Sequence, residues 1–279
     1  MQALKLRILS SSAFILSLSC FLWLLSFPST QFLTPYLILI PALLSLGEFY
    51  NLARGKKFEP LQFVGYISLS LYILATYYHL IGAFNKDVLP SLFMIAFLAG
   101  SCFHFPKTKQ AIANLSITYF GIIYIGFAFQ AILHLGYEMS PLYHVSNVYW
   151  IIYLIFVTKL ADSSAYFAGI LLGKHKMSPS ISPSKTWEGL LGAFIGGIVG
   201  ALLLDSFFPS SLSISAYLLV SFLTIGSGQI GDLFESLLKR DAKIKDSANI
   251  PGLGGVLDVL DSILFAAPVL YICLKIASL

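Results

Sequence analysis

Long apolar runs separated by short polar segments make up most of the chain. A helix needs about 20 apolar residues to cross the hydrocarbon core of a bilayer. Runs of this kind predict nine spans, near residues 8–27, 32–50, 61–82, 88–105, 111–133, 148–171, 189–208, 213–231 and 258–277. The fourth run is short and the first two could form one re-entrant hairpin, so eight or ten spans stay open. The pattern predicts an all-α, polytopic integral membrane protein.

Charged residues in the connecting segments support this arrangement and indicate which connections lie on the cytosolic side of the membrane. With the N-terminus in the cytosol, 14 of the 17 Lys and Arg residues fall in connections on the cytosolic side, and the opposite connections contain only Lys86. Such asymmetry is typical of the positive-inside rule. We therefore expect a multi-pass protein of the inner (cytoplasmic) membrane with a cytoplasmic N-terminus and a cytoplasmic active site.

Composition excludes a soluble protein, and the distribution of polar residues divides the chain into two regions. Hydrophobic residues are 57% and charged residues 11% of the 279 positions, against about 45–50% and 25% in soluble domains. The formal net charge of +4 is too small to indicate a nucleic acid partner. Polar groups collect after Tyr149, which predicts a structural region 1–147 and a catalytic region 148–279 with cytoplasmic loops 172–188 and 232–257. Whether region 1–147 also forms a homodimer stays open.

Lys159 and Asp162 lie inside the predicted span 148–171. An ionisable side chain at that depth is costly and often functional. A structural ion pair at i, i+3 spacing would explain both residues as well. A secondary transporter could use them on a proton or ion path, but transporters tend to carry such charges in both halves, whereas here the charge is concentrated at one cytoplasmic end.

The segment from Ile181 to Gly189 is a candidate phosphate-binding loop. Ser182 and Ser184 supply hydroxyls, Lys185 supplies a cation, and the start of the next helix supplies backbone N–H groups. A capped turn with an interfacial Trp explains the segment about equally well. Phosphate binding here is therefore one of two open interpretations.

Acidic residues at the cytoplasmic ends of the last two spans are candidate metal ligands. Asp232 follows the span 213–231, and Asp258 and Asp261 lie three residues apart on one helix face. Clusters of oxygen ligands without His select hard cations such as Mg²⁺. Asp246 is a weaker candidate ligand. A favourable position at a helix N-terminus would explain one of these aspartates more easily than two.

Basic residues accompany these carboxylates in the connection between the last two spans. They are Lys239, Arg240, Lys243 and Lys245. Cations beside a metal ion at a membrane surface are typical of phosphoryl or nucleotidyl transfer, in which charge on the reacting phosphate is neutralised. An ordinary helix exit with basic anchors would explain Lys239 and Arg240 taken alone.

Three motifs follow one another between residues 150 and 268. They are Asp162 to Gly173, Ser182 to Gly189, and the run Ser236-Leu237-Leu238-Lys239-Arg240 with Lys245-Asp246, Pro251, Gly254-Gly255, Asp258 and Asp261. Together they resemble the phosphatidate cytidylyltransferases, also called CDP-diacylglycerol synthases. The chain has Leu253 where that family has His, and Val259 where it has Arg.

The resemblance implies transfer of a cytidylyl group from CTP to phosphatidic acid, giving CDP-diacylglycerol and pyrophosphate. It implies Mg²⁺, with a second cation left open, and metal ligands Asp232, Asp258, Asp261 and Asp246. Substrate phosphates would be held by Lys185, Lys239, Arg240 and Lys245, with Ser182, Ser184 and Asp162 assisting. A lipid kinase, another lipid nucleotidyltransferase, the transporter and a catalytically silent scaffold are the alternatives.

Overall fold

The computed structural model describes residues 32–85, 88–104, 110–248, 250 and 254–278. The predicted span 8–27 and Leu253 lie outside these described residues. The chain divides into two compact units. The first unit is Met1–Leu133 with Asp241–Val259, and the second unit is His134–Arg240 with Leu260–Leu279.

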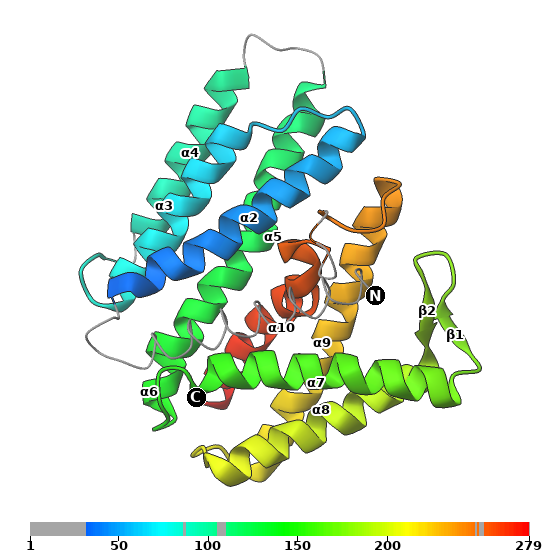
Figure 1. The fold of residues 1–279 in the computed structure, drawn as a ribbon. Coiled ribbons are helices and arrows are strands. Elements are labelled where there is room, and N and C mark those ends of the chain that lie inside the picture. The colour runs from blue at the N-terminus through cyan, green and yellow to red at the C-terminus, as the bar shows by residue number, and fades with distance from the viewer. Residues whose placement is uncertain (1–31, 86–87, 105–109, 249, 251–253, 279) are drawn as a thin grey trace. The chain divides into compact units, whose positions relative to one another are not determined.

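Helices occupy all eight apolar runs that were predicted within the described residues (Figure 1). They are α2 (Thr34–Gly55), α3 (Gln62–Leu80), α4 (Val88–His104), α5 (Ala111–His134), α7 (Tyr149–Leu172), α8 (Trp187–Phe207), α9 (Ile214–Asp241) and α10 (Val256–Ala277). Five residues of π-helix, η2 (Leu135–Met139), and a short α6 (Ser140–Leu142) extend α5. The all-α prediction is confirmed.

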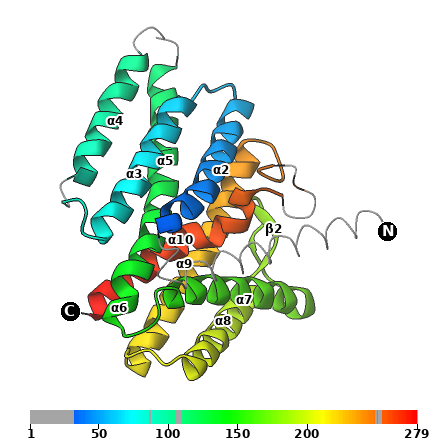
Figure 2. The same cartoon turned by 60° about the vertical axis from the view of Figure 1, so that its left-hand side comes forward.

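Seven membrane-spanning candidates are found among the described residues, because α4, with 17 residues, is shorter than the rest. In the first unit, α2 contacts α3 and α3 contacts α4, and Figures 1 and 2 show these helices side by side. Pro35 lies in the first turn of α2, where its missing N–H group would have no helical partner anyway. The Tyr50 hydroxyl donates to the Thr118 carbonyl at 2.9 Å and joins α2 to α5.

Small residues let α7 and α8 of the second unit pack closely. A Cβ atom at Gly192 would lie 2.4 Å from Cβ of Ala168, and one at Gly200 would lie 2.5 Å from Cδ2 of Leu160. Three glycines spaced four apart form this face of α8, namely Gly192, Gly196 and Gly200. Small residues at this spacing allow close helix packing.

A β-hairpin joins α7 to α8, where the sequence predicts a loop. Its strands β1 (Lys176–Ser178) and β2 (Ser182–Thr186) are antiparallel, with Lys176 opposite Thr186 and Ser178 opposite Ser182. The turn between them begins with Pro179, a residue favoured in turns. Thr186 also caps α8, because its hydroxyl accepts a hydrogen bond from the Gly189 N–H group at 3.1 Å.

Glu188 in the first turn of α8 fixes the base of the hairpin. Its carboxylate accepts hydrogen bonds from the backbone N–H groups of Lys174 and His175 and lies 2.6 Å from Nδ1 of His175. At the other end, Nε of Arg240 donates to the carbonyl of Ile181 at 3.2 Å. The hairpin is thus held by both α8 and the end of α9.

Candidate active site

A cavity of about 530 Å³ lies within the second unit, between the hairpin and helices α7, α8 and α9. Five residues that the sequence singles out line it. They are Asp162, Ser182, Ser184, Lys185 and Asp232. These residues come from three separate segments of the chain. The cavity is therefore a polar hollow in which a cation, hydroxyls and carboxylates face a common space.

Lys185 and Asp232 form an ion pair at this cavity. The Lys185 Nζ atom lies 2.9 Å from Oδ2 of Asp232 and donates to the carbonyl of Gln229 at 3.3 Å. The Lys185 side chain is only 15% exposed and that of Asp232 29%. Lys185 directly precedes Thr186, which caps α8. The cap therefore helps to hold the Lys185 ammonium group beside α9.

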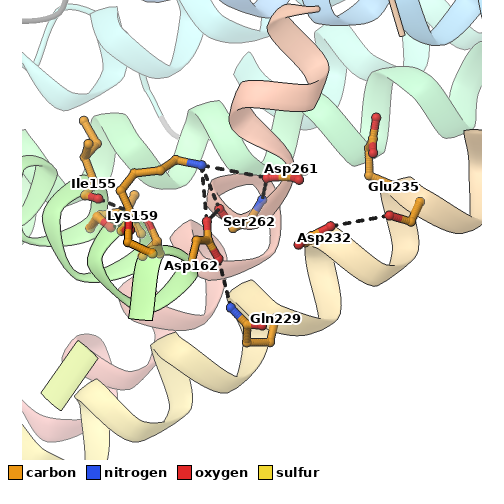
Figure 3. A network of polar contacts seen from close by, with 12 residues as sticks. Ile155, Lys159, Asp162, Gln229, Asp232, Glu235, Asp261 and Ser262 are labelled. Atoms are coloured by element: carbon orange, nitrogen blue, oxygen red, sulfur yellow. Dashed lines mark hydrogen bonds and ion pairs between the residues drawn. The ribbon is translucent and has the colours of Figure 1, made fainter. Parts of the chain in front are cut away.

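Asp162 belongs to a polar network that links three helices (Figure 3). Its Oδ1 atom accepts from Nε2 of Gln229 at 2.9 Å, and its Oδ2 atom accepts from the Ser262 hydroxyl at 3.1 Å. Lys159 lies 3.4 Å from Asp162 and 3.9 Å from Asp261. The predicted i, i+3 ion pair with Lys159 is thus present, and Asp162 also lines the cavity, while its functional role stays a prediction.

Asp232 and Asp261 lie on neighbouring helices and point toward the same space in Figure 3. The backbones of α9 and α10 approach closely there, since a Cβ atom at Gly231 would be 2.5 Å from the Asp261 carbonyl oxygen. Within the described residues, no group of three or more His, Cys, Asp and Glu side chains could hold a metal ion. Mg²⁺ usually takes one or two carboxylates and completes its shell with waters and substrate phosphates. This pair of carboxylates fits that donor set.

The helix α9 continues ten residues beyond the predicted span, and its period places Asp232, Glu235, Ser236 and Lys239 on one face. Lys239 pairs with the fully buried carboxylate of Glu235 at 2.5 Å. Neither Lys239 nor Arg240 is among the described residues that line the cavity. Their predicted contact with substrate stays a prediction, while their observed contacts hold the end of α9.

The remaining predicted residues belong to the first unit. Lys245 and Asp246 are exposed. The Oδ2 atom of Asp258 accepts from the N–H groups of Gly255, at 2.7 Å, and Ser247, at 2.8 Å. Asp258 thus caps the start of α10, the helix that carries Asp261 one turn later. The roles of Asp246 and Asp258 as metal ligands stay predictions.

Two residues of the cavity were missed by the sequence analysis. Lys176 lines the cavity from β1. Gln229 joins Asp162 and Lys185 from α9 and is only 6% exposed. An amide side chain within an apolar span, three residues before Asp232, was the signal that could have identified it.

Comparison with known proteins identifies the family of this chain. The sequence matches the model of the cytidylyltransferase family over residues 5–277. This chain belongs to that family. The match covers both units, so the family likeness is not confined to the three motifs of the C-terminal half.

Curated relatives of this cytidylyltransferase-family chain include proteins named phosphatidate cytidylyltransferase from three bacteria. The Bacillus subtilis (strain 168) protein is 36% identical, covering 88% of this chain and 90% of its own. The Chlamydia pneumoniae protein is 32% identical, covering 90% and 85%, and the Haemophilus influenzae protein is 31% identical, covering 95% and 96%. The predicted resemblance is confirmed.

Proposed function

We propose that this protein is a phosphatidate cytidylyltransferase, which makes CDP-diacylglycerol and pyrophosphate from CTP and phosphatidic acid. The observation that carries the proposal is the convergence of Lys185, Ser182 and Ser184 with Asp162 and Asp232 in one cavity. Cations and hydroxyls bind phosphate oxygens, and carboxylates bind the metal ion that accompanies a nucleoside triphosphate. Family membership supports the same reaction.

The reaction needs positioning more than acid–base chemistry. A phosphate oxygen of phosphatidic acid forms a bond to the α-phosphorus of CTP, and the bond from that phosphorus to the bridging oxygen of the β-phosphate breaks. The electron pair leaves with pyrophosphate. A phosphate monoester is already ionised near neutral pH, so no general base is required, and rate enhancement comes from alignment and charge stabilisation.

Lys185 and Lys176 are the cavity residues suited to hold phosphate groups. Lys185 is fixed by Asp232 and the Gln229 carbonyl, so its ammonium group is positioned before substrate enters. Lys176 lies on the strand opposite, paired with Thr186. Ser182 and Ser184 of β2 supply further donors to the same space.

Asp232 and Asp261 are the residues that would hold Mg²⁺. Bound there, the ion would offset negative charge on the reacting phosphates. The nearby ammonium groups of Lys185 and Lys159 limit repulsion between the two carboxylates when both are ionised. A second cation, and a homodimer, stay predictions.

A membrane-embedded substrate requires an apolar side to the cavity. Tyr166 and Ile170 of α7 line the cavity and are 65% and 63% exposed. Apolar side chains at the rim of a polar hollow suit a lipid whose headgroup enters while its acyl chains stay in the bilayer. The charge pattern of the connections supports an inner-membrane location with this cavity on the cytoplasmic side.

The test is to purify the protein in detergent and to incubate it with phosphatidic acid, Mg²⁺ and CTP labelled at either the α- or the γ-phosphorus. Cytidylyl transfer places the α label in the lipid and the γ label in pyrophosphate. A lipid kinase would place the γ label in the lipid instead. Lipid that acquires no α label would contradict the proposal.

A further inference from the structure

Two carboxylates cap the start of α10 in the first unit. Asp258 does so from within the helix, as described above. Glu48 does so from α2, since its Oε1 atom accepts from the Val256 N–H group at 2.9 Å and its Oε2 atom accepts from the Leu257 N–H group at 2.9 Å. The first N–H groups of a helix have no partner within it, and an anion at this end is stabilised by the helix dipole.

The Ser247 hydroxyl links the two carboxylates. Its Oγ atom lies 2.6 Å from Oε2 of Glu48 and 2.9 Å from Oδ2 of Asp258. A Cβ atom at Gly255 would lie 2.0 Å from this hydroxyl and 2.2 Å from Oε2 of Glu48. Only glycine at that position lets Glu48 come so close. Glu48, Ser247 and Asp258 are called the α10 cap below.

Glu48 is a costly residue to place at this point. It is only 9% exposed, within a mostly apolar helix, and among the described residues no Lys or Arg forms an ion pair with it. A buried carboxylate is tolerated when several donors satisfy it, and here three do. Those donors all belong to the connection between α9 and α10 or to the first turn of α10.

A second contact joins the same helix to the same connection. Lys56, at the end of α2, lies 2.6 Å from Asp241, the last residue of α9. This pair is exposed and contributes little to stability. The buried contacts of Glu48 therefore decide how the connection is held against α2.

We propose that Glu48 is a positioning residue for the cytidylyl transfer, acting through the α10 cap. It holds the first turn of α10 and so fixes the side chain of Asp258, a predicted ligand of Mg²⁺. The inference rests on the proposed function. It gives the predicted structural region 1–147 a direct part in positioning Asp258.

The test compares Glu48→Gln with Ser45→Ala, a matched control. Ser45 is fully buried in the same helix, and its hydroxyl has no hydrogen-bond partner among the described residues. The amide introduced by Glu48→Gln can accept from only one of the two backbone N–H groups, because its NH₂ group is a donor. Ser247→Ala, which removes a single link, serves if Glu48→Gln does not yield folded protein.

Three measurements on the full chain in detergent separate positioning from folding. Deuterium uptake of the segment containing Val256 and Leu257 should rise in Glu48→Gln and Ser247→Ala and stay unchanged in Ser45→Ala. The kcat per folded molecule should fall roughly 10- to 100-fold in Glu48→Gln, as for other residues that orient ligands. The Mg²⁺ concentration that gives half-maximal rate should rise, whereas a purely structural role would change only yield and Tm.

The outcomes are distinguishable. Unchanged uptake in Glu48→Gln would overturn the α10 cap, and raised uptake with unchanged kcat and Mg²⁺ dependence would overturn the positioning role alone. A wild-type protein that forms no CDP-diacylglycerol would overturn the proposed function itself. Non-additive losses in the double variant Glu48→Gln/Ser247→Ala would support one shared link.

Discussion

The Nζ atom of Lys185 lies 2.9 Å from Oδ2 of Asp232, joining the hairpin to α9 at the cavity. Lys185 is predicted to bind a substrate phosphate, and Asp232 is predicted to bind a metal ion. Their ion pair places the predicted phosphate-binding and metal-binding groups next to each other. It also keeps two partly buried charges compensated before substrate arrives.

Replacing Asp232 by Asn should lower cytidylyl transfer by roughly 100-fold or more, the scale of losing one preorganised electrostatic group. The amide keeps the shape of the carboxylate but cannot offer the negative charge that Mg²⁺ needs. The initial rate of CDP-diacylglycerol formation measures the effect. Asp205→Asn is the control, since Asp205 lies near the far end of α8 and accepts hydrogen bonds from Ser210. Equal rates in the two variants would exclude Asp232 from the metal site.

Replacing Lys185 by Met should weaken use of CTP. Hydrogen bonds to charged groups contribute about 1.5–3 kcal/mol, which corresponds to roughly 10- to 100-fold in kcat/KM. Lys185→Arg keeps the charge and should retain more activity than Lys185→Met. Lys174→Met removes an exposed cation that is not among the described residues lining the cavity, and it should behave as wild type. A normal kcat/KM in Lys185→Met would refute its contact with phosphate.

Replacing Lys159 by Met should destabilise the second unit, because Asp162 and Asp261 both lose their nearby ammonium group. A hydrogen bond to a charged group contributes about 1.5–3 kcal/mol. Thermal unfolding in detergent should therefore show a lower Tm, with Lys159→Arg closer to wild type. An unchanged Tm in Lys159→Met would contradict a stabilising role for this ammonium group.

Replacing Gly192 by Ala should separate α7 from α8. The new Cβ atom would lie 2.4 Å from Cβ of Ala168 and 2.9 Å from the Ser164 carbonyl oxygen, so the helices must move. Overpacking of this kind typically costs about 1–3 kcal/mol. Gly226→Ala is the control, because its Cβ atom would meet Phe194 at an ordinary 3.6 Å. We expect a lower Tm only for Gly192→Ala, and equal Tm values would contradict the close packing.

Sequence analysis predicted the helices well and the connections poorly. The predicted apolar runs matched all eight long helices of the described residues. The segment from Ser182 to Thr186 was expected as a loop and forms a strand instead. Its partner strand, β1, carries no apolar alternation that would have predicted pairing.

Glu48 is a second ionisable group inside an apolar span, like Asp162, and its position alone marks it as a candidate for a special role. Its partners Ser247, Val256 and Leu257 are about 200 residues away in the sequence. No local pattern could have named them, because the pairing follows from how α2 packs against the start of α10.

The sequence by itself determined the apolar helices and the family, because lipid admits only segments that satisfy their own backbone hydrogen bonds and because the motifs survive as ordered runs of residues. Tertiary structure alone decided which polar groups meet. Lys185 pairs with Asp232, Asp162 with Gln229, and Lys239 with buried Glu235. These pairings depend on how each helix is rotated and how closely small residues let neighbours approach, and neither quantity is encoded in any single segment.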